Sequence, residues 1–311
     1  MNITGNCTEE QKNPVFVVVY TTVFTVGLFL NITALVVFRY TKMRSHTTVY
    51  MIHLAITDLL LIFSLPVRIL YHLGYSISPV LCEGIPLFLL INMYGSIFLL
   101  TLICFDRCMA VCFPLLPWVM EGRKKAPRIC LGVWVLNIGI SLPIYFIKRN
   151  NTTKDLCFRR HPSYTTQPIE VALTLSIGFG IPLVVMLLSS WAMIRAITRS
   201  AVAQTDLIDI GKIQRMVTIN LAIFFTCFMP YHVTLALYAY SNVAPCSLLK
   251  SYRYTLMVAC LNAMLDPLAY YFTTETFRNK VDMDKVRRMF LLNNESSSTR
   301  NVKVSKGAEN T

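Results

Sequence analysis

Charged residues are scarce in this 311-residue chain: Asp, Glu, Lys and Arg make up 14% of it, whereas hydrophobic residues make up 55%. A soluble domain of this length is about a quarter charged. The scarcity therefore excludes an ordinary soluble globular protein. The charges that are present lie in short segments between long apolar blocks, a pattern typical of a protein that crosses a membrane several times.

Acidic residues are the scarcer kind, with 16 Asp and Glu against 29 Lys and Arg and a net charge of +13. If the N-terminus lies outside, 20 of the 29 basic residues fall in cytosolic segments. Such an excess predicts an outer N-terminus and a cytosolic C-terminus. The positive charge is then a feature of the cytosolic membrane surface, and it does not indicate nucleic-acid binding.

The sequence also lacks a short apolar segment with a small-residue cleavage site before its first long block, so we expect that block to act as a signal anchor. Seven apolar blocks predict an all-α fold, a bundle of seven transmembrane helices. The expected spans cover residues 14–39, 47–74, 80–113, 126–147, 167–199, 212–241 and 248–272.

Four regions follow from this pattern. We expect an extracellular N-terminus (1–13), the membrane bundle (14–272), an amphipathic helix on the inner membrane surface (273–292) and a disordered cytosolic tail (293–311). Sequons predicted to lie outside, and so to be glycosylated, begin at Asn2, Asn6, Asn150 and Asn151. The predicted phosphorylation sites of the tail, through which arrestin would bind, are Ser296, Ser297, Ser298 and Thr299.

Four of the ten cysteines lie in predicted extracellular segments, where disulfides persist. Four cysteines allow three pairings. We expect Cys82 to pair with Cys157, which would hold the long outer loop over the helix ends, and Cys7 to pair with Cys246. The other six cysteines are expected to be small buried residues.

Each span carries a polar residue or a proline that a plain membrane anchor would not need. Polar groups within a bilayer are costly and must find partners inside the bundle, and prolines kink helices. With Trp134 taken for the fourth span, which also contains Pro143, one marked residue per helix follows in chain order: Asn31, Asp58, Arg107, Trp134, Pro182, Pro230 and Pro267. This set resembles the signature residues of the rhodopsin-like (class A) G-protein-coupled receptors over nearly the whole chain.

The sequence departs from the common family pattern at Cys108, Phe228, Asp266 and Ser190. Phe228 and Asp266 resemble the purinergic and lysophospholipid branch. Within it, residues 93–96 and 141–145 look most similar to the lysophosphatidylinositol-type receptor.

The resemblance implies a receptor that signals to a heterotrimeric G protein, with helix six moving outward at its cytosolic end. Asp106 is expected to restrain Arg107 until the G protein binds. The other residues implied in activation are Phe224, Phe228, Pro230 and Tyr270. No cofactor is expected except a sodium ion as allosteric modulator, held by Asp58, Ser96, Asn262 and Asp266; a pair of carboxyls that shares a proton is the alternative.

The expected ligand is an anionic lipid, such as a lysophospholipid or another lipid acid. Leu89 occupies the position where amine receptors of this family carry an aspartate, and Arg68 lies below the outer rim. A guanidinium suits an anionic head group. The full set of candidate ligand residues is Arg68, Tyr71, Leu89, Met93, Tyr94, Arg159, Arg160, Tyr231, His232, Leu235 and Arg253.

Other functions remain as alternatives. A nucleotide or a small carboxylate is the runner-up ligand, and a proton sensor would need more outer histidines than His72 and His161. An intramembrane enzyme would need a paired nucleophile and base, and neither His53 nor His232 has an obvious partner in the sequence. A transporter would show internal repeats with broken helices, and the sequence shows none.

Overall fold

The computed structural model describes residues 12–40, 46–113, 116–150, 168–199, 210–241 and 246–273. Within these ranges the chain is helical and forms no strand. Its helical segments, in chain order, are α1 (Pro14–Tyr40), α2 (His46–His72), α3 (Pro79–Cys112), α4 (Pro117–Lys124), α5 (Ala126–Asn150), α6 (Pro168–Leu173), η2 (Thr174–Gly180), α7 (Ile181–Arg199), α8 (Ile210–Ile223), η4 (Phe224–Phe228), α9 (Met229–Tyr240), α10 (Cys246–Ala259) and α11 (Asn262–Thr273).

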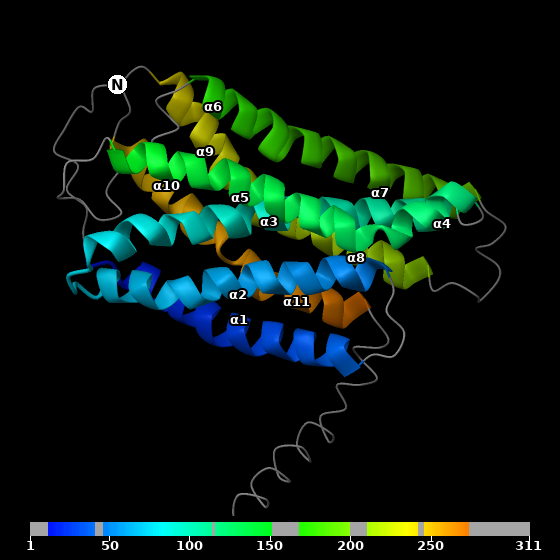
Figure 1. Ribbon diagram of the computed structural model, residues 1–311, viewed down its shortest axis with the longest axis horizontal. Helices are drawn as coiled ribbons and strands as arrows, with labels where there is room; N and C mark the ends of the chain where they lie inside the picture. Colours follow the sequence, from blue (N-terminus) through cyan, green and yellow to red (C-terminus); the bar gives the residue numbers. More distant parts are fainter. Residues whose placement is uncertain are drawn as a thin grey trace, which may run out of the picture.

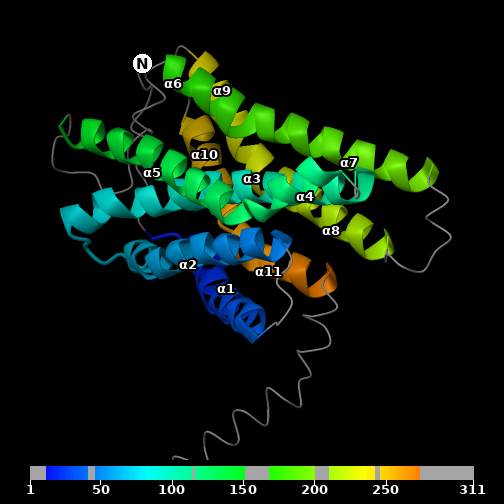
Figure 2. The ribbon, with the colours of Figure 1, turned by 45° about the vertical axis from the view of Figure 1, so that its right-hand side comes forward.

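The long helices run side by side along the long axis of the molecule and alternate in direction (Figures 1 and 2). The central helix α3 packs against α2, α5 and α7, while α1 packs against α2 and α11. Each expected span has its counterpart: the fifth is α6–η2–α7, the sixth is α8–η4–α9 and the seventh is α10 with α11. The expectation of an all-α bundle is confirmed.

Five of the described helical stretches are long and apolar enough to cross a membrane, and a sixth is added if the bent pair α4 and α5 counts as one span. The seventh expected span does not form one helix, contrary to the sequence-based expectation for residues 248–272. α10 ends at Ala259 and α11 begins at Asn262, with a turn between them. Helix α5 also extends to Asn150, beyond the expected end at Ile147.

The first turn of α11 contains a carbonyl that a proline leaves without its helical donor. Pro267 has no N–H, so the carbonyl of Ala263, four residues earlier, receives no helical hydrogen bond. The Asn31 side chain of α1 donates to that carbonyl over 2.7 Å, and also to the Gly27 carbonyl over 3.0 Å. Gly27 lets the helices approach, because a Cβ there would lie 3.0 Å from Ile62 and 3.3 Å from the Ala263 oxygen.

Two helices widen into π-helical turns just before or across a proline. Segment η2 precedes Pro182, and segment η4 precedes Pro230. A proline ring clashes with the carbonyl four residues before it, and a wider turn relieves that clash. The expected kinks of helices five and six therefore take the form of π-turns.

The buried side chains form two groups. One cluster joins α3 to α5, α7, α8, η4 and α9, and it includes Met93, Tyr231 and Leu235. The other joins α1, α2 and the outer part of α3 to the α10–α11 region, and it includes Tyr20 and Leu89. The candidate ligand residues are thus distributed over both clusters.

Candidate functional site

In the outer half of the bundle, aromatic rings from α3, η2 and α9 pack around His232. The imidazole stacks on Phe179, with ring centroids 4.2 Å apart, and meets the edge of Tyr94 at 6.0 Å. Phe179 also stacks on Phe224 at 5.2 Å, so it links the two π-turns. Gly178 allows this packing, since a Cβ there would lie 2.8 Å from the Tyr94 ring.

The two nitrogens of His232 have different roles. Nδ1 lies 2.8 Å from the carbonyl oxygen of Phe228, which can only accept, so in the neutral imidazole Nδ1 carries the proton. Nε2 is then an acceptor. Among the described residues this buried atom has no hydrogen-bond partner. The site therefore offers an acceptor that a hydrogen-bond donor on a ligand could satisfy.

Arg68 of α2 is partly buried and lies near α1. Its guanidinium carbon lies 6.0 Å from the ring centroid of Tyr20, a cation–π distance. Close by, His72 stacks on Phe16 with centroids 4.5 Å apart, and the Phe16 ring also contacts Tyr254 at 5.0 Å. An arginine with an aromatic lining thus marks the side of the bundle formed by α1, α2 and α10.

The structure brings most of the other candidate ligand residues into the interior. Tyr231 is buried, and its hydroxyl lies 3.4 Å from that of Tyr252 on α10. The others that are buried are Tyr71, Leu89, Met93 and Leu235, and Arg253 is partly buried on α10. Arg159 and Arg160 lie outside the described residues.

A polar cluster crosses the middle of the bundle, around the predicted ion site. Asn92 of α3 donates to Asp58 over 3.0 Å, and Asn262 of α11 donates to the Ser96 hydroxyl, also over 3.0 Å. All these side chains and Asp266 are buried. Within the described part of the chain, Oδ2 of Asp58, both carboxyl oxygens of Asp266 and Oδ1 of Asn262 have no hydrogen-bond partner. These oxygens are suitable ligands for a hard cation such as sodium.

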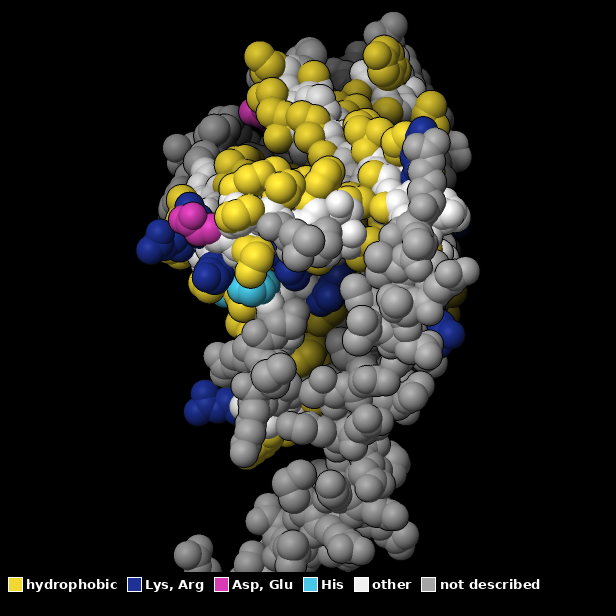
Figure 3. Space-filling model, turned by 90° about the vertical axis from the view of Figure 1, so that its right-hand side faces the viewer, with side chains coloured by type: hydrophobic (Ala, Val, Ile, Leu, Met, Phe, Trp, Pro, Cys, Tyr) yellow, Lys and Arg dark blue, Asp and Glu magenta, His cyan; other side chains and the backbone are white. Residues whose placement is uncertain are grey.

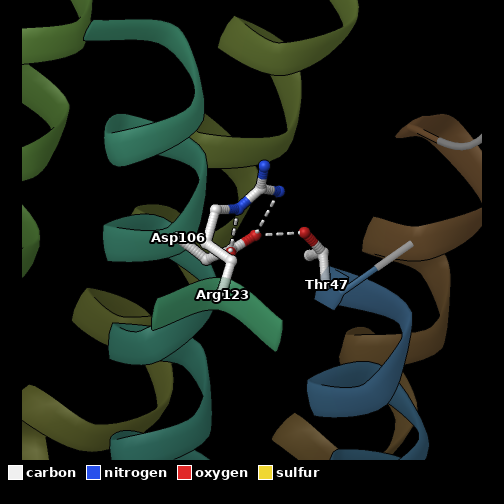
Figure 4. A network of polar contacts seen from close by, with 3 residues as sticks. All are labelled: Thr47, Asp106 and Arg123. Carbon is white, nitrogen blue, oxygen red and sulfur yellow. Dashed lines mark hydrogen bonds and ion pairs between the residues drawn. The ribbon is translucent and has the colours of Figure 1, made fainter. Parts of the chain in front are cut away.

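Near the C-terminal end of α3, Asp106 joins three helices (Figure 4). Its Oδ1 accepts a 2.7 Å hydrogen bond from Nε of Arg123 on α4, and its Oδ2 accepts one of 3.2 Å from Nη2 of the same arginine. The Thr47 hydroxyl of α2 also donates to Oδ2. The hydrogen-bonded ion pair that the structure describes for this carboxylate is with Arg123. The expected restraint of Arg107 by Asp106 stays a prediction.

The end of the molecule that carries α4 has many Lys and Arg side chains and few acids (Figure 3). The exposed cations that the structure describes at this end are Arg39, Lys124, Lys125, Arg128, Arg195 and Arg215. Acids described there are Asp106, which is buried, and Glu121, which forms a 3.6 Å ion pair with Lys125. This distribution accords with the charge asymmetry of the sequence.

The residues implied in activation are placed mainly in and near η4. Phe224 and Phe228 are fully buried and meet edge to face at 6.0 Å, and Pro230 begins the next turn in α9. The backbone of Tyr270 lies in α11, but its side chain is outside the described residues.

Cys82 and Cys246 are both disulfide-bonded, as expected for outer cysteines. Their predicted partners, Cys157 and Cys7, lie outside the described residues, so the pairing stays a prediction. The six remaining cysteines of the described ranges are free thiols, as expected. The sequons at Asn2, Asn6 and Asn151, the amphipathic helix 273–292 and the phosphorylation sites Ser296, Ser297, Ser298 and Thr299 are also outside the described residues, and the side chain of Asn150 is as well.

Two further hydrogen bonds join α5 to its neighbours. The indole N–H of Trp134 donates to Nδ1 of His53 over 3.0 Å, which joins α5 to α2. This bond gives His53 a structural role. Asn137 of α5 donates to the carbonyl of Ile91 over 2.7 Å and joins α5 to α3.

Residues 30–270 match the sequence model of the family described as "7 transmembrane receptor (rhodopsin family)". The chain belongs to this family. It is therefore a multi-pass membrane receptor of the G-protein-coupled class. This family membership rules out the alternative of an intramembrane enzyme.

Relatives of this rhodopsin-family receptor include lysophosphatidic acid receptor 6 of Gallus gallus, which is 33% identical over 88% of this chain and 95% of that receptor. Lysophosphatidic acid receptor 4 of Homo sapiens is 32% identical over 87% of this chain and 77% of its own length. Cysteinyl leukotriene receptor 1 of Homo sapiens is 30% identical over 90% of this chain and 91% of its own length. These relatives confirm the branch, whereas the finer likeness to lysophosphatidylinositol-type receptors stays a prediction.

Sequence reasoning missed several partners within this receptor. It did not single out Asn92, which is the hydrogen-bond donor to Asp58. It also did not single out Arg123 and Thr47, the donors to Asp106, or Phe179, which stacks on His232. A signal existed for Asn92, because it lies four residues before Ser96 on the same helix face. Arg123 had none, since its position depends on the fold of the loop.

Proposed function

We propose that this protein is a plasma-membrane receptor, with its N-terminus outside, that binds an anionic lysophospholipid or related lipid acid. Binding in the outer half of the bundle would then activate a heterotrimeric G protein. The observation that carries the proposal is Arg68, a partly buried cation beside the Tyr20 ring, above an interior of apolar and aromatic side chains. The relatives named for lysophosphatidic acid and for cysteinyl leukotrienes support a ligand that combines an acid with a long apolar part.

The anionic head group and the acyl chain of such a ligand would contact different parts of the site. A guanidinium forms two parallel hydrogen bonds with a phosphate or carboxylate, and burial strengthens them. Buried Leu89 and Met93 of α3 and Leu235 of α9 provide apolar surface for an acyl chain. A nucleotide has no long apolar chain to bury against these side chains, so it is the weaker candidate.

A third polar contact is proposed for a hydroxyl group of the ligand. The acceptor Nε2 of His232 has no partner among the described residues, and it lies in a ring of aromatic side chains. An acceptor needs a donor, and an anionic group has none to offer. The free hydroxyl of a lysophospholipid would fit this position, whereas a simple fatty acid would leave it unsatisfied.

The orientation, the cytosolic partners and the ion site belong to the same proposal. The excess of Lys and Arg at the end that carries α4 supports a cytosolic position for that end, where the G protein would bind. Arrestin would bind the phosphorylated tail. A sodium ion would be held by Asp58, Ser96, Asn262 and Asp266, whose unpartnered buried oxygens support such a site within the described region.

The test is a panel of lysophosphatidic acid, lysophosphatidylinositol, a cysteinyl leukotriene and ADP, read out by dissociation of the G protein in cells. We expect response to a lipid acid and none to ADP. Arg68→Ala should then weaken the active lipid by about 1.5–3 kcal/mol, the worth of a charge-assisted hydrogen bond, and Arg253→Ala by somewhat less.

Lys250→Ala is the matched control, because it removes an exposed charge of the same sign from the same end of the molecule. It should leave potency nearly unchanged. A lipid agonist of full potency on the Arg68→Ala receptor would show that the head group binds elsewhere.

A further inference from the structure

Asn220 of α8 is a buried amide whose hydrogen-bonding capacity is only partly used. Its side chain is 1% exposed, and among the described residues its Oδ1 has no hydrogen-bond partner. Its Nδ2 contacts the thiol sulfur of Cys104 on α3 at 3.8 Å. Because sulfur is a weak acceptor, this contact recovers little of the free energy that burial of an amide costs.

The buried hydroxyls described on two neighbouring helices are already used within those helices. Helix α8 packs against α3, α7 and α11. On α3, the hydroxyl of Thr101 donates to the Ile97 carbonyl over 2.7 Å. On α7, the hydroxyl of Ser190 donates to the Met186 carbonyl over 2.6 Å. A hydroxyl has one proton, so neither group is available as a donor to Oδ1 of Asn220.

Asn220 lies just before the part of this span that bends most easily. The π-turn η4 begins at Phe224, about one helical turn later, and Pro230 follows it. Helices bend at π-turns and at prolines, so α8 can tilt about η4 while α9 stays packed against α10. A tilt away from α3 would separate Asn220 from Cys104 and bring the amide within reach of water from the cytosolic end.

The free-energy cost of the buried amide therefore applies to the packed arrangement of α8 and is relieved when α8 tilts. A cost that applies to one of two states shifts the equilibrium toward the other state. A leucine at the same position has no polar atom to satisfy, and its burial against α3 is favourable. The identity of this one side chain thus affects how often α8 leaves α3.

We propose that Asn220 raises the ligand-free activity of this receptor, because its unsatisfied amide destabilises the packing of α8 against α3. The inference rests on the proposed coupling to a G protein at the end of the bundle that carries α4, and it is independent of which ligand binds. Asn220 then determines how active the receptor is before any ligand arrives.

A clamp between α3 and α8, formed by the same contact of Asn220 with Cys104, predicts the opposite sign. Loss of a clamp would raise ligand-free activity and lower the stability of the bundle. Loss of an unsatisfied amide lowers the activity and raises the stability. The variant Asn220→Leu, which has a similar size and no polar atoms, distinguishes the two roles.

The experiment uses purified receptor in phosphatidylcholine nanodiscs, without ligand, and measures nucleotide exchange on purified G-protein heterotrimers. Heterotrimers of several Gα classes are screened, and the one that exchanges fastest with wild type is used. Asn220→Leu should lower the receptor-dependent exchange rate at least about fivefold, equivalent to about 1 kcal/mol, and should raise the midpoint of thermal unfolding. Asn220→Val, a smaller apolar replacement, should change both quantities in the same directions.

Thr101→Val is the matched control, because it removes a buried hydroxyl whose hydrogen bond is made within its own helix. It should not raise the unfolding midpoint, and its exchange rate should stay near that of wild type. Exchange in Asn220→Leu at or above the wild-type rate would overturn the proposal.

A wild-type receptor that leaves every heterotrimer at its receptor-free exchange rate would also overturn it. Addition of lysophosphatidic acid and the other lipids of the panel then separates the two failures. Exchange that rises with a lipid would show that coupling is intact and that only the ligand-free activity is missing, whereas no rise would count against the proposed function itself.

Discussion

At the scale of single residues, the site contains buried polar side chains in which one atom has a hydrogen-bond partner and another has none among the described residues. His232 is the clearest case: its Nδ1 hydrogen-bonds to the Phe228 carbonyl, and its Nε2 has no partner among the described residues. A buried acceptor without a donor costs free energy, and a ligand that supplies the donor recovers it. Ligand preference should therefore follow the presence of a hydroxyl group.

Substitution His232→Phe tests this, because a phenyl ring can keep the stack on Phe179 but cannot accept a hydrogen bond. Lysophosphatidic acid should lose about 1 kcal/mol of apparent affinity, the net worth of a neutral hydrogen bond. Its analogue without the free hydroxyl should bind wild type and His232→Phe equally. Equal losses for both lipids, in competition binding, would place the hydroxyl away from His232.

A second prediction at this scale concerns Asp58 and Asp266. Two carboxyls buried together cannot both be charged without a cation or a proton. We expect sodium to lower agonist affinity by about fivefold or more, measured against N-methylglucamine at equal ionic strength. Asp58→Ala should remove the difference between the two salts. If wild-type affinity is the same in both, the carboxyls share a proton instead.

At the scale of elements, the prolines of helices five, six and seven each lead to a different local structure. Pro182 and Pro230 follow π-turns, whereas Pro267 follows a turn that separates α10 from α11. In the seventh span, the carbonyl that proline leaves without a helical donor is satisfied by Asn31 from α1. A side chain of the first helix thus stabilises an interruption in the last.

Asn31→Leu should destabilise the receptor by about 1–3 kcal/mol, because the Ala263 carbonyl would be buried without a donor. The measurement is thermal unfolding in detergent, followed by the reactivity of the buried thiol of Cys260, which adjoins the turn. Thr33→Val is the control: the Thr33 hydroxyl bonds only within its own helix, to the Phe29 carbonyl, so its loss should cost far less. Equal stability of Asn31→Leu and wild type would contradict this role.

At the scale of the whole molecule, helices that alternate in direction bring the end of α2 and the starts of α3 and α10 to one side, and the start of α2, the end of α3 and helix α4 to the other (Figure 1). The proposed ligand site and the Asp106 network therefore lie at opposite ends of the bundle. The polar cluster of Asp58 and the π-turn at Phe224 lie between them.

The disulfides are the prediction that belongs to this scale. Cys82 and Cys246 are both bridged, and we expect Cys157 and Cys7 as their respective partners. Peptide mapping by mass spectrometry without reduction should find these two pairs. Cys82→Ser should lower the amount of receptor at the cell surface, whereas Cys130→Ser, which removes a free thiol, should not. A map that pairs Cys82 with Cys246 would refute the assignment.

Much of the architecture could be read from the chain because a bilayer imposes strict requirements. Apolar runs of about 20 residues predict spans, and the asymmetry of Lys and Arg predicts orientation. Polar residues inside those runs, such as Asn31 and Asp58, must find partners in the bundle, so residue type and depth alone mark them as important. Prolines likewise predict where a helix departs from regular α-helical geometry.

Tertiary structure alone decided which residue meets which. The donor to Asp106 is Arg123 on the neighbouring loop helix, and the ring stacked on His232 is Phe179 from a different helix. The division of the seventh span also depends on Asn31, far away in the chain. Helical periodicity shows which side chains avoid lipid, but contacts between helices depend on how the helices pack and how their turns widen. Those are properties of the assembled bundle, which no single segment of the sequence contains.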